Sequence, residues 1–196
     1  ALGAPLGELL LIQNDATADS AVRRHVAHLF VLAGSPARAT ALFREMLQRR
    51  PDDADALGGL GQAEFSRGDY RGAEADLLLA TKLAPADTAL AHRLDRVREV
   101  RQLDPLVRGL GARERERRSR QLLTMVADAA AGCAALANAA PVRAVIDSVR
   151  NEVQRESGSR LLDRADQSWA VMPGSCRRGP RDSETALSLV MDKLGQ

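Results

Sequence analysis

The residues best suited to bind a metal ion are the two histidines of the segment HVAH, His25 and His28. They are three positions apart, so a helix would present both imidazoles on one face. Imidazole nitrogens are common ligands for zinc and related metals. The sequence offers no clear third ligand nearby, so it predicts no metal site, and both histidines are expected to have another role.

No set of residues in the sequence has the spacing of a catalytic site. The segment GSC at 174–176 lacks the strand–turn–helix context of a nucleophile elbow. The glycines of LGGLGQAEF fall within an expected helix, whereas a phosphate-binding loop joins a strand to a helix. The sequence therefore predicts neither an enzymatic activity nor a cofactor.

The chain has two cysteines, Cys133 on an expected apolar helix face and Cys176 in the loop PGSCRRGPRD. They have no CxxC spacing and no clustered histidine, so they are poor zinc ligands. Two interpretations stay open. They are unrelated thiols of a cytoplasmic protein, or they form a disulfide that ties the loop to the helix. We favour the disulfide, which would place the protein in an oxidising compartment such as the bacterial periplasm.

The run RERERRSR, residues 113–120, is the densest charged segment. It could be a helix that binds phosphate or acidic groups, or a solvated helix with Glu–Arg pairs four residues apart. Because acidic residues are interleaved and no aromatic residue is present to stack on bases, we favour the solvated helix. The formal net charge of +2 adds no strong field, so we expect no nucleic-acid partner.

The elements that carry these residues are expected to be helices. Hydrophobic residues make up 45% of the 196 residues but aromatic residues only 3%, so most of the apolar volume comes from leucine, alanine and valine. This mixture favours helices at close range over a β-sandwich. No stretch approaches the roughly 18 uncharged apolar residues of a membrane span. The chain begins at Ala1, which leaves open a trimmed domain or a processed product.

Two stretches in the first half of the chain share one pattern at a shift of about 34 residues, a period typical of helix–turn–helix repeats. Small residues align with small ones, turn glycines with each other, and large apolar residues with large ones. The aligned pairs are Ala27 with Gly61, Gly34 with Gly68, Ala39 with Ala73, Phe43 with Leu77, Met46 with Ala80, and Pro51 with Pro85. Glu64 aligns with Phe30 and is the exception.

This pattern resembles the tetratricopeptide repeat family. The second repeat matches best, at Leu57, Leu60, Gly61, Gly68, Tyr70, Ala73, Leu77, Ala80 and Pro85. Two departures are Leu57, where an aromatic residue is usual, and Glu64, where a large residue is usual. In the first repeat, Arg23 and Pro36 depart from the pattern. Gly61 and Ala73 are predicted to let paired helices approach closely.

The resemblance implies an all-α fold, a helix–turn–helix solenoid wound as a right-handed superhelix, followed by a helical C-terminal extension. We expect a partial repeat or linker over 1–17, repeats over 20–53 and 54–87, a capping helix over 88–101, and the extension over 104–196, which gives a repeat domain over 18–103. In the extension, Asp104-Pro105 is predicted to start a helix, and apolar spacing predicts helices through Leu122–Leu136, Val142–Val153, Leu161–Trp169 and Leu187–Leu194, the last capped by Ser183.

Certain first-helix positions of the resembling family face a concave groove that holds peptides. Carried across by position, they give the candidate groove residues Arg24, His25, His28, Gln62, Phe65, His92, Arg93 and Arg96, with Asp55 and Gly58 at further groove positions. This surface would be basic, more so near pH 6 when imidazoles protonate, and would suit acidic or C-terminal carboxylate peptides. Only Arg24 and Arg93 match the family's carboxylate clamp, so we do not predict a chaperone-tail clamp. Alternatively, these are ordinary polar residues or are covered by the extension.

We therefore expect a non-enzymatic scaffold or adaptor that binds a peptide or segment of another protein in the groove. Its expected setting is a bacterial envelope or multiprotein assembly, with a periplasmic or envelope-associated location favoured and a cytoplasmic one as the alternative. Two alternatives stay open: an interaction or targeting module of a larger enzyme or sensor, and a self-associating structural protein. The oligomeric state is not predicted.

Overall fold

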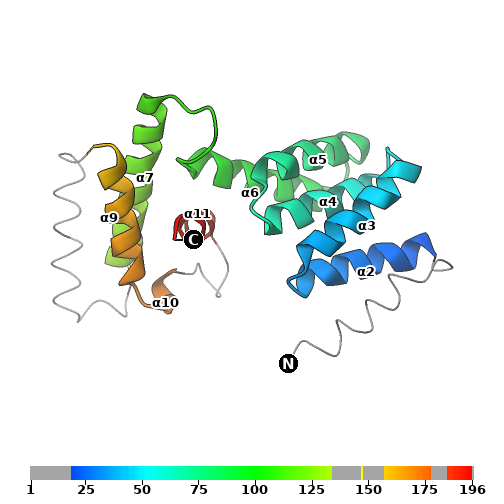
Figure 1. Cartoon of the computed structure of the whole chain (residues 1–196), viewed down its shortest axis with the longest axis horizontal. Coiled ribbons are helices and arrows are strands. Elements are labelled where there is room, and N and C mark those ends of the chain that lie inside the picture. Colours follow the sequence, from blue (N-terminus) through cyan, green and yellow to red (C-terminus); the bar gives the residue numbers. More distant parts are fainter. Residues whose placement is uncertain (1–18, 134–146, 148–156, 178–184, 196) are drawn as a thin grey trace. The chain divides into compact units, whose positions relative to one another are not determined.

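The computed structural model describes residues 19–133, 147, 157–177 and 185–195, and these residues contain helices and no strands (Figure 1). The all-α prediction is confirmed. The chain divides into two compact units, Ala1–Arg98 and Glu99–Gln196. The predicted partial repeat over 1–17 and, apart from Asp147, the predicted helix over 142–153 lie outside the described residues.

The first unit contains two helical hairpins. The first hairpin is α2 (Ser20–Leu32) with α3 (Pro36–Arg49), and the second is α4 (Ala54–Ser66) with α5 (Tyr70–Leu83). Helix α6 runs from Thr88 to Leu103, and the boundary between the two units falls within it. Successive helices of the hairpins reverse direction and pack side by side (Figure 1). The repeat predicted from the 34-residue shift is therefore present as two consecutive hairpins.

The turn within each hairpin depends on a glycine at the same repeat position. Gly34 has φ +71° and Gly68 has φ +75°, a left-handed conformation that side chains other than glycine adopt rarely. Pro36 then occupies the first turn of α3, where a missing N–H costs no helical hydrogen bond. At the start of α4, the side chain of Asp53 accepts a hydrogen bond from the Ala56 N–H at 3.0 Å.

Small residues on α4 let three neighbouring helices approach its backbone. A Cβ added to Gly61 would lie 2.7 Å from Leu77 Cγ on α5. A Cβ on Gly58 would lie 2.5 Å from Leu90 Cδ2 on α6, and one on Gly59 would overlap the Phe43 ring on α3. The predicted close approach at Gly61 is confirmed. Gly58 and Gly59 have the same role toward two other helices.

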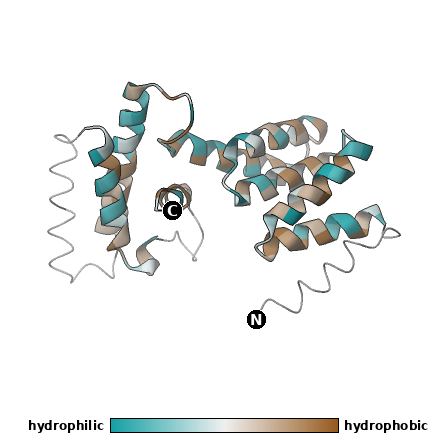
Figure 2. Ribbon diagram, in the orientation of Figure 1, coloured by the Kyte–Doolittle hydropathy of each residue, from teal (hydrophilic) through white to brown (hydrophobic). Residues whose placement is uncertain are grey.

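The core of the first unit lies between α2, α3 and α4. Its buried residues are Val26, Ala27, Phe30, Ala39, Leu42, Phe43, Ala56, Leu60 and Ala63. Each of these helices also has hydrophilic residues, as Figure 2 shows by colour. Burial of one apolar face per helix supplies the main favourable free energy of this packing.

The second unit is built on α7 (Ala112–Ala131), α9 (Ser159–Ala170), the short α10 (Gly174–Arg177) and α11 (Ala186–Leu194). Helices α7 and α9 lie side by side, and α11 contacts both (Figure 1). The buried apolar residues include Leu122, Leu123, Val126, Ala130, Leu161, Ala165, Trp169, Val190 and Met191. The apolar stripes predicted for these three helices therefore correspond to buried faces.

Four local predictions for the second unit are wrong, the first being the loop predicted at Cys176, which lies in the short helix α10. Helix α7 ends at Ala131 with Gly132 as its C-cap, so Cys133 follows the helix rather than lying on its face. Asp104 does not start a helix, because its N–H completes the last turn of α6 by bonding to the Val100 carbonyl at 3.0 Å. Ser183 is not the cap of α11, because Thr185 and Ser188 exchange the hydrogen bonds of a capping box there.

Asp104 instead belongs to a buried ion pair within the second unit. Its side chain is 1% exposed, and Oδ2 lies 2.6 Å from the Nζ of Lys193 on α11. Oδ1 accepts a hydrogen bond from the Leu106 N–H at 2.8 Å. The Arg118 guanidinium donates to the backbone carbonyl of Asp104 at 3.2 Å. These contacts fix the segment before α7 to the C-terminal helix.

Candidate functional site

His28 is half-buried on α2, where the charges of three other candidate residues act on it. Its imidazole lies edge-on to the buried Phe43 ring, with ring centroids 5.1 Å apart. Burial lowers the pKa of His28, and the nearby positive charges of Arg93, Arg24 and His25 lower it further. Charged groups on both α2 and α6 act on His28. The surroundings of His28 therefore disfavour the imidazolium and oppose the gain of charge that the sequence predicts near pH 6.

Arg24 is held by two carboxylates rather than facing the surface as an unpaired cation. Its guanidinium lies 2.9 Å from Asp55 and 3.1 Å from Asp53. Asp53 also accepts from Arg50 at 2.9 Å while it caps α4. The surface is consequently less basic than the sequence suggested. Asp53 was missed because it precedes the helix that carries the matched family positions.

A second cluster surrounds Phe65 on α4. The guanidinium carbon of Arg96 lies 6.0 Å from the centre of the Phe65 ring, within the range of a cation–π contact. The centre of the Tyr70 ring, at the start of α5, lies 5.2 Å from the centre of the Phe65 ring. Two of the candidate residues, Phe65 and Arg96, are thus in contact, and Tyr70 supports them.

Gln62 and His92 are not joined to either cluster. Gln62 is half-buried on α4, and His92 is exposed on α6. Within the described part of the chain, no hydrogen bond or ion pair connects either side chain to another candidate residue. That all three histidines act on one surface stays a prediction.

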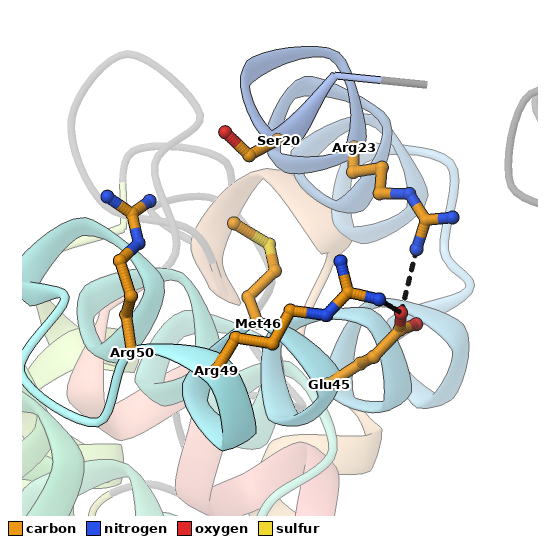
Figure 3. A pocket seen from close by; sticks show the side chains of 6 residues that line it. All are labelled: Ser20, Arg23, Glu45, Met46, Arg49 and Arg50. Carbon is orange, nitrogen blue, oxygen red and sulfur yellow. Dashed lines mark hydrogen bonds and ion pairs between the residues drawn. The ribbon is translucent and has the colours of Figure 1, made fainter. Parts of the chain in front are cut away.

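A small pocket that the sequence did not suggest opens between α2 and α3 (Figure 3). It is lined by Ser20, Arg23, Glu45, Met46, Arg49 and Arg50. Glu45 lies on one side, 2.7 Å from Arg23 and 3.1 Å from Arg49, and Met46 lies near the centre of the view. Since Glu45 already binds two of the arginines, the pocket has no arrangement suited to proton transfer or nucleophilic attack.

The charged run on α7 is a solvent-facing ion-pair network. Glu114 contacts Arg117 and Arg118 at 2.7 Å each, and Glu116 contacts Arg120 at 3.0 Å. Hydrogen bonds from Arg117 and Arg118 lower the pKa of Glu114 to about 2. Each arginine named here faces a carboxylate on its own helix, so the run agrees with the solvated-helix interpretation rather than a phosphate-binding one.

Cys133 and Cys176 are joined by a disulfide in the second unit, with Cα atoms 5.5 Å apart. The bond connects the end of α7 to α10 across 43 residues of sequence. Arg177, next to Cys176, donates hydrogen bonds to the carbonyls of Met172 at 2.8 Å and Ala170 at 2.6 Å. These contacts hold the end of α9 close to the bridge.

Two further findings concern the described ranges alone. Within them, no three His, Cys, Asp or Glu side chains are grouped in a way that could hold a metal ion. No helix in the same ranges is long and apolar enough to cross a membrane.

Paired antiparallel helices in consecutive hairpins define the first unit as an α-helical repeat structure. Residues 30–96 match the family model for the tetratricopeptide repeat. That stretch of the chain is therefore a tetratricopeptide-repeat region, as the resemblance predicted, and such repeats generally mediate protein–protein interaction. No curated protein and no solved structure matched the chain.

Proposed function

We propose that this protein is a non-enzymatic adaptor that binds a segment of a partner protein on the surface formed by α2, α4 and α6. The observation that supports this most directly is the cluster around His28. The charges of Arg24, His25 and Arg93 act on its imidazole, and the charge of Asp55 on α4 opposes them. Polar groups of three successive first helices thus influence one site, on a repeat whose general role is protein recognition.

Within this surface, Arg93 is the residue best placed to bind an acidic group of the partner. It is exposed on α6, and no carboxylate among the described residues is paired with it. Arg24 has a different role, because its ion pairs with Asp53 and Asp55 connect α2 to α4. The Phe65 ring offers a flat apolar surface, and the Arg96 guanidinium beside it carries a positive charge. A partner segment with an acidic residue, or its terminal carboxylate, near an apolar side chain fits this pattern.

Capture of partners from a cell extract, followed by mass spectrometry, tests the proposal. The wild-type chain is compared with Arg93→Glu/Arg96→Glu, which reverses two charges of the surface. The matched control is Arg108→Glu/Arg113→Glu, which makes the same change of charge at exposed positions of the second unit. We expect the control to retain the proteins that wild type captures and the α6 variant to lose them.

Folding of all three proteins is verified by circular dichroism, since loss of helix would remove binding trivially. If the α6 variant folds and captures the same proteins in the same amounts as wild type, partner binding does not use this surface.

A further inference from the structure

Glu64 occupies a position at which a large residue is usual in the repeat pattern. It lies on α4 and is only 4% exposed. Its Oε1 accepts a hydrogen bond from Arg44 on α3 at 3.1 Å, but the Arg44 side chain is itself 58% exposed. One solvent-exposed arginine compensates poorly for the burial of a carboxylate, because taking a charge out of water costs several kcal/mol unless the charge is well paired.

The second oxygen of Glu64 faces other acids. No donor reaches Oε2 among the residues that the structure describes. A Cβ added to Gly72 on α5 would lie 2.5 Å from Glu64 Oε2 and 2.8 Å from Asp69 Oδ2, so both carboxylates converge on that glycine. Asp76, one turn further along α5, is within hydrogen-bonding reach of the same Glu64 carboxyl. Three acids thus meet where α4 packs on α5.

We propose that Glu64 and Asp76 share one proton across the α4–α5 contact, and that this proton holds the second hairpin together. With the proton on Glu64, its carboxyl becomes a donor to the Asp76 carboxylate and no longer carries a buried charge. Without it, two neighbouring carboxylates and Asp69 face the single charge of Arg44. Repulsion then acts across the helix pair that Gly61 and Gly72 bring into close contact.

The electrostatics of the cluster agree with this arrangement. Burial raises the pKa of Glu64 to about 7, the charges of Asp76 and Asp69 raise it too, and Arg44 opposes them. Burial also raises the pKa of Asp76. These are the charged groups that face Glu64 from α3, from α5 and from the residue that caps α5.

The sign of the resulting pH dependence follows from linkage. A carboxyl whose pKa is higher in the folded state than in the unfolded state binds more protons when folded. For Glu64 the window runs from its ordinary value, 4.5, to about 7. Its contribution to stability is present below this window and is lost as the pH rises through it. The stability contributed by surface carboxylates that are paired with arginines has the opposite pH dependence. The test must therefore separate the effect of Glu64 from theirs.

Carbon-13 NMR of the glutamate side-chain carboxyls in the full-length protein measures the proton directly. Glu64→Gln identifies the Glu64 resonance by its disappearance. We expect this resonance to titrate near pH 7, and Asp76→Asn to move its midpoint downward by removing the neighbouring anion. A Glu64 resonance that titrates in the ordinary range of an exposed glutamate overturns the proposal.

Hydrogen exchange measures the effect on the hairpin. Peptides from α4 and α5 are followed at pH 5.5 and 8 (roughly a unit either side of the midpoint), after correction for the intrinsic rate. Glu64→Gln keeps a donor toward Asp76 and has no proton to lose, so we expect the protection of wild type relative to this variant to fall from the lower pH to the higher. The control, Glu45→Gln, removes a carboxylate from α3 that lies 41% exposed between two arginines.

A protection difference between wild type and Glu64→Gln that does not change with pH overturns the proposal. A protection difference between wild type and the Glu45→Gln control that changes with pH in the same way also overturns it. If Glu64→Gln fails to fold, Glu64 is identified as the glutamate resonance whose midpoint moves in Asp76→Asn, and the titration of that resonance in wild type decides the matter.

Discussion

Gly58, Gly59 and Gly61 face three different neighbours, the side chains of Leu90, Phe43 and Leu77. A glycine in a helix interior costs about 1 kcal/mol relative to alanine. Here that cost is offset because each missing Cβ leaves room for a large side chain of another helix. The apolar area that those side chains bury contributes more, at about 1.5–3 kcal/mol for each fully buried leucine or phenylalanine.

Gly59→Ala tests this at one residue. We expect a loss of about 1–2 kcal/mol in the free energy of unfolding, because overpacking against the fully buried Phe43 outweighs the helix propensity gained. Chemical denaturation followed by circular dichroism measures it. The control is Gly174→Ala in α10, where an added Cβ meets nothing within 4 Å and little change is expected. A Gly59→Ala chain as stable as wild type would show that Phe43 can shift.

The sequence alone could predict the role of a residue type that recurs at the repeat period, but not the role of one that occurs in a single repeat. Gly61 could be predicted because Ala27 occupies the same place one repeat earlier. Gly59 has no small equivalent in the first repeat, where His25 aligns with it, so its role needed the structure. Glu64 was visible only as a mismatch. Its burial against Asp76 depends on contacts between two helices, which a periodic pattern does not contain.

At the scale of the element, the start of α4 is fixed by Asp53, which serves two purposes there. The side chain caps the helix through the Ala56 N–H, and the same carboxylate binds Arg24 and Arg50. Its side chain is only 8% exposed. The cap therefore also fixes where α4 lies relative to α2, which sets the surface on which His28 stands.

Substitution of Asp53 separates the cap from the ion pairs. Asp53→Ala removes both, and we expect a loss of about 1–2 kcal/mol in unfolding free energy. Asp53→Asn keeps an oxygen for the Ala56 N–H, so its loss should be smaller. Thermal unfolding compares them, with the exposed neighbour Asp52 replaced by alanine as the control. Equal losses in the alanine and asparagine variants would assign the whole effect to the charge.

The elements of the first unit were easier to predict than those of the second. In the hairpins, glycine at Gly34 and Gly68 and proline at Pro51 and Pro85 mark the ends at a fixed period. In the second unit no period exists, and apolar spacing located the helices but not their ends. Gly132 ends α7 one residue before Cys133, a distinction that the apolar pattern could not make.

At the scale of the whole molecule, the second unit is tied together by residues distant in sequence. Asp104 and Lys193 are 89 residues apart and form the buried pair that anchors α11. Neither residue has a local signal for this role, since one follows a helix and the other lies in the last turn of another. Apolar spacing could therefore predict a helical extension, but not what fastens its end.

Lys193→Met should weaken the second unit, because it leaves the Asp104 carboxylate buried without its cation. We expect a loss of roughly 2–4 kcal/mol, below the full value for a buried pair because Lys193 is 38% exposed. Adding Asp104→Asn, which keeps an acceptor for the Leu106 N–H, should recover part of it. Fluorescence of Trp169, the one tryptophan of the chain, reports unfolding of this unit. A double variant no more stable than Lys193→Met would argue against the pair as the cause.

The bridge between Cys133 and Cys176 makes the intervening polypeptide a covalently closed ring. A protease that cuts the chain once inside this ring opens it without releasing a fragment. The nicked molecule keeps its mass, and its two pieces separate only after a reductant is added. In an oxidising surrounding, the second unit would thus tolerate a single break in its backbone that a linear helical protein of the same length would not.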